Sequence, residues 1–206
     1  ATFATLKEFP NRQLLGEEVI WNGNDEEGYH SSHRILSKGT HLGDGFYGKP
    51  TKKDIYYRVI ADCACKNNQV YDEWLVRDQG AIVRQLGMDP KNYAANLIEM
   101  QGGKDKCNQP FNNSTDHEIL YSQLPLSQDN AGTEYANFLE NIFKGNFDIF
   151  SKSYDRSVNQ EQPGGFKGLG IDEAKDFWIK LKSSFPDSKF KIEHISYLEE
   201  KNQYKK

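Results

Sequence analysis

The residue best suited to acid–base chemistry is Glu73, in a segment that alternates as a β-strand. The alternation places Glu73 on the same face as Tyr71 and Leu75. An apolar surround raises the pKa of a carboxyl group toward neutrality, so a carboxylate among such neighbours is suited to act as a general base. Two alternatives stay open: an ion pair with Arg77 on the same strand face, or a solvated position at the strand end.

Further polar residues precede this strand. Asp62 is a candidate partner for Glu73 in an acid/base pair of the kind that hydrolases and dehydratases use. His33 and Arg34 follow two serines and suit an oxyanion, or else a structural hydrogen-bond network. His33, His41, Asp62 and Glu73 have the chemistry of zinc ligands, but their spacing is irregular, so no metal and no cofactor is predicted.

The composition limits the classes of partner. The chain has 206 residues and a mass of 23.7 kDa, which suffices for one large domain or two small ones. A net charge of −4 without a basic block argues against nucleic acid. No apolar run has the length of a membrane span, and no signal peptide opens the chain. An odd number of cysteines, three, predicts reduced thiols and a cytoplasmic protein.

Aromatic residues make up 13% of a chain that is only 36% apolar, which favours an aromatic-rich core or pocket. Trp21, Trp74 and Trp178 are expected either in that core or on the wall of the pocket.

The first hundred residues predict a strand-rich unit. Strands are expected over 14–21, 29–37 and 54–66, followed by the Glu73 strand, all joined as an antiparallel meander. A helix then ends at Gly87, and Asp89 with Pro90 marks the start of the next one. Asp78 is either a second acid or the cap of the helix that follows it.

The rest of the chain divides into a linker and a helix-rich unit. Residues 101–130 are rich in glycine, proline and asparagine and read as a linker. Helices are expected over 135–143, 147–154 and 172–184, with a strand directly after the second of them and another over 190–198. We therefore expect a strand-rich part at 1–100, a linker at 101–130 and a helix-rich part at 131–206.

A weak repeat relates the two parts. Phe185-Pro186 followed by Glu193, Ile195 and Tyr197 repeats, at an offset of 176, Phe9-Pro10 followed by Glu17, Val19 and Trp21. The repeat predicts a chain that begins midway through one module and stops midway through a second.

Several motifs together resemble the SnoaL-like proteins of the nuclear transport factor 2-like superfamily, in a tandem form. The motifs are Phe9-Pro-Asn-Arg, Glu17-Glu-Val-Ile-Trp21, Ser31-Ser-His-Arg34, Gly39-Thr-His-Leu-Gly43, Gly48-Lys-Pro-Thr51, Ala61-Asp-Cys63, Glu73-Trp-Leu-Val-Arg-Asp-Gln79 and Arg84-Gln-Leu-Gly87. The resemblance covers residues 3–95 well and 130–198 more loosely. It implies an α+β cone, in which helices pack on the concave face of a strongly curved antiparallel sheet and leave a pocket.

The resemblance also implies a chemistry. Polyketide cyclases of this kind use a carboxylate base, without metal or cofactor, in an intramolecular aldol reaction, and Glu73 directly before Trp74 matches the position of that base. Three features depart from the pattern: Glu replaces Asp, two extra residues precede Arg84, and the strand over 54–66 lacks a histidine, with Asp62 in part of that space. A complete cone needs helices from 130–185 over the sheet of 10–80, supplied by the same chain in a permuted order or by a partner; otherwise the chain is a fragment.

The functional expectation is a pocket for a small, largely apolar carbonyl or polyketide-like compound. Glu73, with Asp62 and His33, would carry the chemistry, and the enolate would be held by hydrogen-bond donors such as His33, Arg34 or Tyr71. The residues expected to bind substrate are Arg34, His41, Trp21, Tyr71, Trp74 and Trp178. The rival expectation is a non-catalytic ligand-binding or oligomerisation module, since fold does not determine function. A homodimer or higher oligomer is expected in either case.

Overall fold

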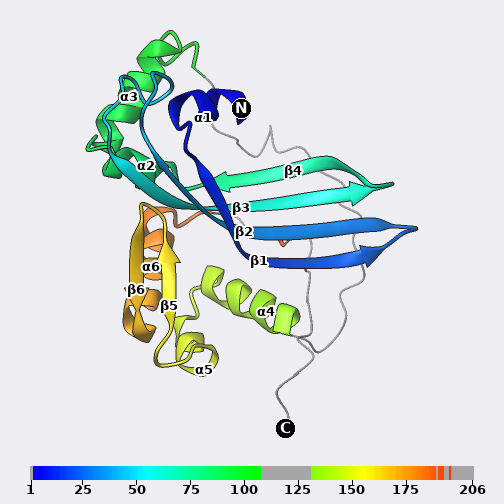
Figure 1. Cartoon of the computed structure of the whole chain (residues 1–206). Coiled ribbons are helices and arrows are strands. Elements are labelled where there is room, and N and C mark those ends of the chain that lie inside the picture. Colours follow the sequence, from blue (N-terminus) through cyan, green and yellow to red (C-terminus); the bar gives the residue numbers. More distant parts are fainter. Residues whose placement is uncertain (1, 108–130, 189, 193–194, 196–206) are drawn as a thin grey trace.

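The computed structural model describes residues 2–188 apart from 108–130, together with 190–192 and 195 (Figure 1). Its main feature is an antiparallel sheet of four strands in chain order: β1 (Gln13–Asn24), β2 (Gly28–Thr40), β3 (Asp54–Lys66) and β4 (Gln69–Arg77). Asn67 and Asn68 join β3 to β4 with φ of 52° and 57°, the backbone of a tight hairpin turn that asparagine tolerates well. The predicted meander is confirmed, and so is the α+β class.

Three helices accompany the sheet: α1 (Thr2–Glu8), α2 (Gln79–Gln85) and α3 (Pro90–Met100). The Asp89 side chain accepts a hydrogen bond from the Asn92 N–H at 2.9 Å, and Pro90 opens α3, as the sequence predicts. Gly87 follows α2 with φ of +85°, a conformation that ends the helix at little cost for glycine.

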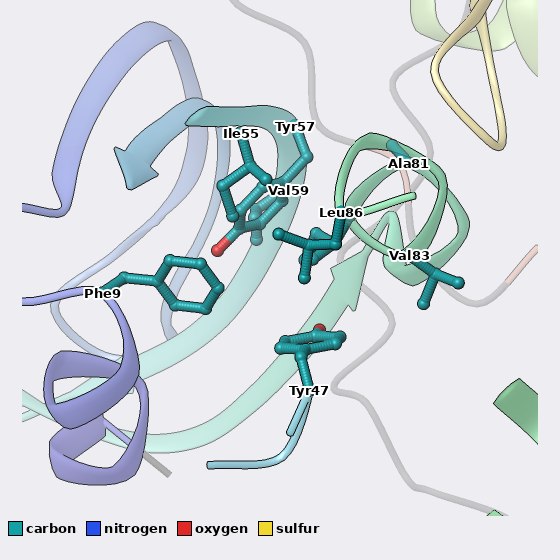
Figure 2. Packing of buried hydrophobic residues seen from close by; sticks show 9 residues of the cluster. Phe9, Tyr47, Ile55, Tyr57, Val59, Ala81, Val83 and Leu86 are labelled. Carbon is teal, nitrogen blue, oxygen red and sulfur yellow. The ribbon is translucent and has the colours of Figure 1, made fainter. Parts of the chain in front are cut away.

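The first core lies between one end of the sheet and these helices. Figure 2 shows Phe9 at the end of α1, Tyr47 in a loop and Leu86 just after α2 turned toward the residues of β3. Ile82 is almost fully buried because α2 turns its apolar stripe toward β3. The buried members of this core are Phe9, Tyr47, Ile55, Tyr57, Val59, Ala81, Ile82, Val83 and Leu86.

The helix-rich part follows the order that the sequence predicts. It contains α4 (Ala131–Phe143), the short 3-10 helix η1 (Phe147–Ile149), α5 (Phe150–Ser153), β5 (Asn159–Gln162), β6 (Phe166–Leu169) and α6 (Gly170–Ser184). Its own core gathers around Phe138, Ile142, Phe150 and Ala174. The sequence predicts a strand after the second helix, where β5 lies, but not its pairing with β6, although a Pro-Gly-Gly turn separates the two strands.

The two parts touch each other through this hairpin. Arg58 of β3 pairs with Glu161 of β5 at 2.9 Å, and the Arg84 guanidinium lies 4.9 Å from the ring centre of Phe166. Assignment of the two parts to separate modules stays a prediction. Residues 101–107 form turns, whereas the rest of the predicted linker, and most of the predicted strand over 190–198, lie outside the described residues.

Candidate functional site

The strand register divides the predicted site residues between the two faces of the sheet. Trp21, Ser31, Cys63 and Glu73 are successive cross-strand partners from β1 to β4. Partners across an antiparallel ladder point to the same face, so these four side chains form one row. We call this side the Glu73 face. His33, two positions from Ser31, shares it.

The opposite side, which we call the Trp74 face, carries a second set. Asp62 is the partner of both Ser32 and Trp74, one position out of step with the Glu73 row. Arg34 lies on this side as well, because its partner Ile60 is two positions from Asp62. The predicted acid/base pair of Asp62 and Glu73 is therefore wrong: the two carboxylates leave opposite faces of the sheet.

Glu73 is exposed in the structure, and this corrects the surround that the sequence predicts for it. Tyr71 is 61% exposed and Leu75 is 46% exposed, so neither encloses the carboxylate. Among the described residues, no ion pair joins Glu73 to Arg77 either, although Arg77 lies half-buried at the end of β4. Of the three sequence-based interpretations, the solvated position fits the observed exposure of Glu73 best.

Polar chemistry is present on the Glu73 face beside the carboxylate. The Ser31 hydroxyl oxygen lies 2.6 Å from Nε2 of His33, a short hydrogen bond between two half-buried side chains. Burial raises the pKa of the Cys63 thiol, and the negative charge of its partner Glu73 adds to the effect. This thiol is thus held in its neutral form and is not an activated nucleophile.

Aromatic surface flanks these polar groups. Trp21 is 49% exposed, and its ring centre lies 5.9 Å from that of Tyr29 on the neighbouring strand. Tyr71 stands at a register shift opposite Ala64 and Cys65, where β4 carries one extra residue. The Glu73 face therefore presents apolar rings to the solvent, next to a hydroxyl, an imidazole and a carboxylate.

On the Trp74 face, the charges of Arg34 are already engaged. Its guanidinium lies 3.3 Å from Glu17 and 3.5 Å from Glu18, both on the adjacent strand β1. Trp74 is 42% exposed. A joint oxyanion site of His33 and Arg34 is therefore wrong, because the two side chains leave opposite faces, and the alternative of a structural network fits the ion pairs of Arg34.

Two predicted substrate-binding residues lie away from both faces. His41 is fully buried beside Phe9, where Nε2 faces the carboxylate of Glu8 at 3.6 Å. Trp178 of α6 belongs to the second core, with its ring centre 6.3 Å from that of Phe143. The predicted place of His41 in a pocket with Glu73 is therefore wrong, and of the two interpretations of Trp178, core or pocket wall, the core is the one observed.

The sequence reasoning missed Glu8. This residue is only 3% exposed, and a charged side chain is rarely buried to that extent without a partner. Glu8 directly precedes the Phe9-Pro10 pair, where α1 ends, and this position next to a core residue was the sequence feature that could have indicated its burial.

The described part of the chain contains no cluster of three or more histidine, cysteine, aspartate or glutamate side chains arranged to hold a metal ion. None of the described helices combines the length and the apolar character that a membrane crossing requires. Two surface hollows, of about 510 and 580 Å³, lie between α4 and α5 and at the end of the sheet near Asp54. Neither hollow is lined by a predicted site residue.

Comparisons with known proteins leave the family open. No family model matches the chain, and no curated protein matches it. Among solved structures, it is similar to AclR, described as a putative hydroxylase from Streptomyces galilaeus, with 23% identity and a TM-score of 0.38. The match covers 43% of this chain and 62% of AclR, less than two thirds of the length of that protein. Similarity at this level supports no statement about fold or activity.

Proposed function

We propose that this chain is a SnoaL-like module of the cone type, which binds a small, largely apolar carbonyl compound on the Glu73 face. The observation that carries the proposal is the row from Trp21 to Glu73, in which an exposed indole and a carboxylate share one face of the sheet. Exposed aromatic rings bind flat ligands by stacking, while nearby polar groups fix their orientation.

The polar groups suit a carbonyl ligand. His33 and Ser31, already joined at 2.6 Å, offer a donor for the carbonyl oxygen. Glu73 offers an acceptor for a hydroxyl group, or a base for a proton alpha to the carbonyl. In a catalytic cycle, Glu73 would take that proton and His33 would stabilise the enolate oxygen, after which the enolate would close a ring or be reprotonated.

Abstraction of a proton alpha to a carbonyl is favoured where water is excluded from the developing enolate, and the Glu73 carboxylate is exposed in this structure. We therefore place binding first and carbon-acid catalysis second. The catalytic form would need a cover over the Glu73 face, supplied by the ligand, by a second copy or by another segment of the chain.

Solvent-deuterium exchange at the alpha carbon of cyclic ketones and beta-keto esters, detected by NMR, separates these functions. Exchange that Glu73→Gln abolishes and Asp62→Asn preserves would establish carbon-acid chemistry on the Glu73 face, because Asp62 leaves the other face. Binding of panel members without exchange would identify a non-catalytic module. Absence of both binding and exchange across the panel would refute the proposal.

A specific observation favours assembly as a second candidate function. Both faces of the sheet expose large apolar side chains, with Val19, Trp21 and Leu75 on one side and Ile60, Trp74 and Val76 on the other. Ile60 and Val76 are cross-strand partners and Trp74 lies two positions from Val76, so these three form adjacent apolar surface, which is typical of protein interfaces. Sedimentation velocity would show an oligomer that Val76→Asp dissociates, with the exposed Glu18→Gln as a control on the same face; a monomeric wild-type chain would exclude this function.

A further inference from the structure

A second set of polar residues lies outside the Glu73 face, around the buried imidazole of His41. Nδ1 of His41 is 3.2 Å from the hydroxyl oxygen of Thr51 and accepts the Thr51 backbone N–H at 3.3 Å. Nε2, on the other side of the ring, is 3.6 Å from Oε1 of Glu8. The imidazole thus lies between a buried carboxylate and the hydroxyl of Thr51, an exposed residue. Nε2 makes no hydrogen bond within the described part of the structure, so its contact with Glu8 is electrostatic at 3.6 Å.

These contacts determine the tautomer of the imidazole. A backbone N–H can only donate, so Nδ1 of His41 is an acceptor and the ring proton resides on Nε2, which faces Glu8. The Thr51 hydroxyl can then donate to the same Nδ1 lone pair, which it shares with the Thr51 N–H, while its oxygen accepts the Lys53 N–H at 3.4 Å. The arrangement is that of a nucleophile, a base and an orienting carboxylate.

The Glu8 carboxylate is held firmly in its place. It accepts the Tyr47 N–H at 2.5 Å, while the Glu8 backbone carbonyl accepts the N–H groups of Leu42 and Gly43 at 3.0 Å. A Cβ at position 45 would lie 2.5 to 2.7 Å from the Glu8 side chain, so only glycine allows this close approach. The loop after β2 is therefore built around the carboxylate.

We propose that Thr51, His41 and Glu8 form a relay that activates the Thr51 hydroxyl as a nucleophile toward acyl esters. In this relay His41 is the base and Glu8 is a positioning residue that acts through His41. The proposal is independent of the function assigned to the Glu73 face, because none of the three residues belongs to that face.

The surroundings of Thr51 indicate the class of acyl donor. Lys49 and Lys52 flank Thr51 in the same exposed loop, so an ester that carries a carboxylate on its acyl chain fits best. Lys52 has φ of 58°, a left-handed conformation that is uncommon for a residue other than glycine. Such backbone strain is frequent beside functional side chains.

The reaction is an ordinary ester hydrolysis in two steps. The Thr51 oxygen attacks the carbonyl carbon and passes its proton to Nδ1 of His41; the bond from that carbon to the leaving alcohol oxygen then breaks, and the alcohol takes the proton from His41. Water attacks the resulting acyl-threonine in the same way, which releases the carboxylic acid and returns the proton to Thr51. The net change is ester plus water to acid plus alcohol.

The test uses p-nitrophenyl acetate and the anionic mono-p-nitrophenyl glutarate with the full chain. We expect release of p-nitrophenol with an acyl adduct on the peptide containing Thr51, located by mass spectrometry, and faster reaction of the anionic ester. Thr51→Val should lower the rate about 100-fold and Thr51→Ser should restore it. Thr40→Val is the matched control, because the Thr40 hydroxyl donates to Asp54 and contacts no histidine among the residues described.

Glu8→Gln tests the positioning role, with circular dichroism to confirm the fold. We expect a lower kcat for mono-p-nitrophenyl glutarate with an unchanged KM, since Glu8 acts through the imidazole on the reacting atoms and does not touch the ester. An unchanged rate in Thr51→Val, an adduct located elsewhere, or no acylation of the wild-type chain would each overturn the proposal.

Discussion

The Asp78 carboxylate accepts the backbone N–H of Gly164 through both of its oxygens, each at 2.9 Å. It also accepts the N–H groups of Gly165 at 3.0 Å and of Ala81 at 2.9 Å. Gly164 and Gly165 have φ of +87° and +77°, and successive N–H groups in such conformations form an anion-binding concavity. Asp78 therefore caps α2 and at the same time fixes the turn of the β5–β6 hairpin.

Replacement of Asp78 by alanine should destabilise the chain more than the loss of a simple helix cap does. Three N–H donors lose their acceptor, so we expect Asp78→Ala to lower the free energy of unfolding by about 2–4 kcal/mol. Asp89→Ala is the matched control, because Asp89 caps α3 through the Asn92 N–H alone, and it should cost about 1 kcal/mol. Urea denaturation followed by circular dichroism measures both values.

Hydrogen exchange adds a local measurement to this comparison. The amides of Gly164 and Gly165 should exchange faster in Asp78→Ala and at the wild-type rate in Asp89→Ala. Equal destabilisation by the two substitutions, with unchanged exchange at both glycines, would mean that the hairpin contact contributes nothing to stability.

The Glu17 carboxylate gives the chain an acid-sensitive contact. A bidentate hydrogen bond from Arg58 at 2.9 Å, with further help from the charge of Arg34, holds the pKa of Glu17 below its ordinary value of 4.5. A carboxyl group with a lowered pKa stabilises the folded state above its unfolded pKa, and this contribution is lost as the pH falls through the folded pKa. The contact therefore matters at neutral pH and disappears in acid.

The measurement compares the stability of the wild type and Glu17→Gln as a function of pH. We expect the wild type to be more stable at neutral pH and the difference to shrink once the pH falls below about 4.5. Glu18→Gln serves as the control, since Glu18 pairs only at 3.5 Å with an exposed Arg34. A difference that stays constant down to strongly acidic pH would show that the charge of Glu17 contributes nothing.

Local signals predicted much of the fold. The period-2 alternation located β3 at 54–66 with its observed bounds, and the Asp89-Pro90 start of α3 matched the observed cap. The apolar stripe of α4 predicted its buried face around Phe138 and Ile142. These elements were predictable because each depends on short-range periodicity or on one capping side chain.

The candidate site was less predictable, because it depends on contacts between distant residues. The alternation within β4 predicts that Glu73 and Tyr71 share a face. Only the register between β3 and β4 shows that the Asp62 side chain lies on the opposite face of the sheet. The burial of His41 depends on Glu8, which is distant in sequence and reaches His41 only because α1 packs against the loop after β2. Likewise, nothing near Asp78 in the sequence indicates its contact with the β5–β6 turn.

Tyrosine ionisation should report on the two cores separately. Burial, followed by the charge of Tyr135, raises the pKa of Tyr154 to about 12, and burial together with the charge of Glu8 raises that of Tyr93 to about 12. The neutral phenols are favoured in the folded state, so their contribution to stability is lost as the pH rises from about 10 toward 12.

Ultraviolet absorbance of tyrosinate during an alkaline titration measures this effect. The absorbance change near pH 12 should be smaller by the contribution of one tyrosine in Tyr154→Phe, and by the same amount in Tyr93→Phe. An absorbance change near pH 12 as large as that of the wild type, in either variant, would show that the replaced tyrosine does not titrate in this range.

The two exposed tryptophans of the sheet can show which face binds a ligand. Trp21 lies on the Glu73 face and Trp74 on the Trp74 face, and both are accessible to an aromatic ketone such as 1-tetralone. If the ketone stacks on the Glu73 face, it should quench the fluorescence of Trp21, and Trp21→Phe should remove that quenching. Trp74→Phe should leave the quenching intact, while Trp178, common to both variants, provides a constant background.

Affinity gives a second measure of the same contact. Loss of the indole in Trp21→Ala should weaken binding about fivefold to tenfold, since an aromatic stacking contact contributes about 1 kcal/mol. Trp74→Ala is the matched control on the opposite face and should leave the dissociation constant unchanged. The reverse pattern, with binding lost in Trp74→Ala and retained in Trp21→Ala, would move the ligand to the Trp74 face. In that case Asp62, the cross-strand partner of Trp74, would replace Glu73 as the carboxylate next to it.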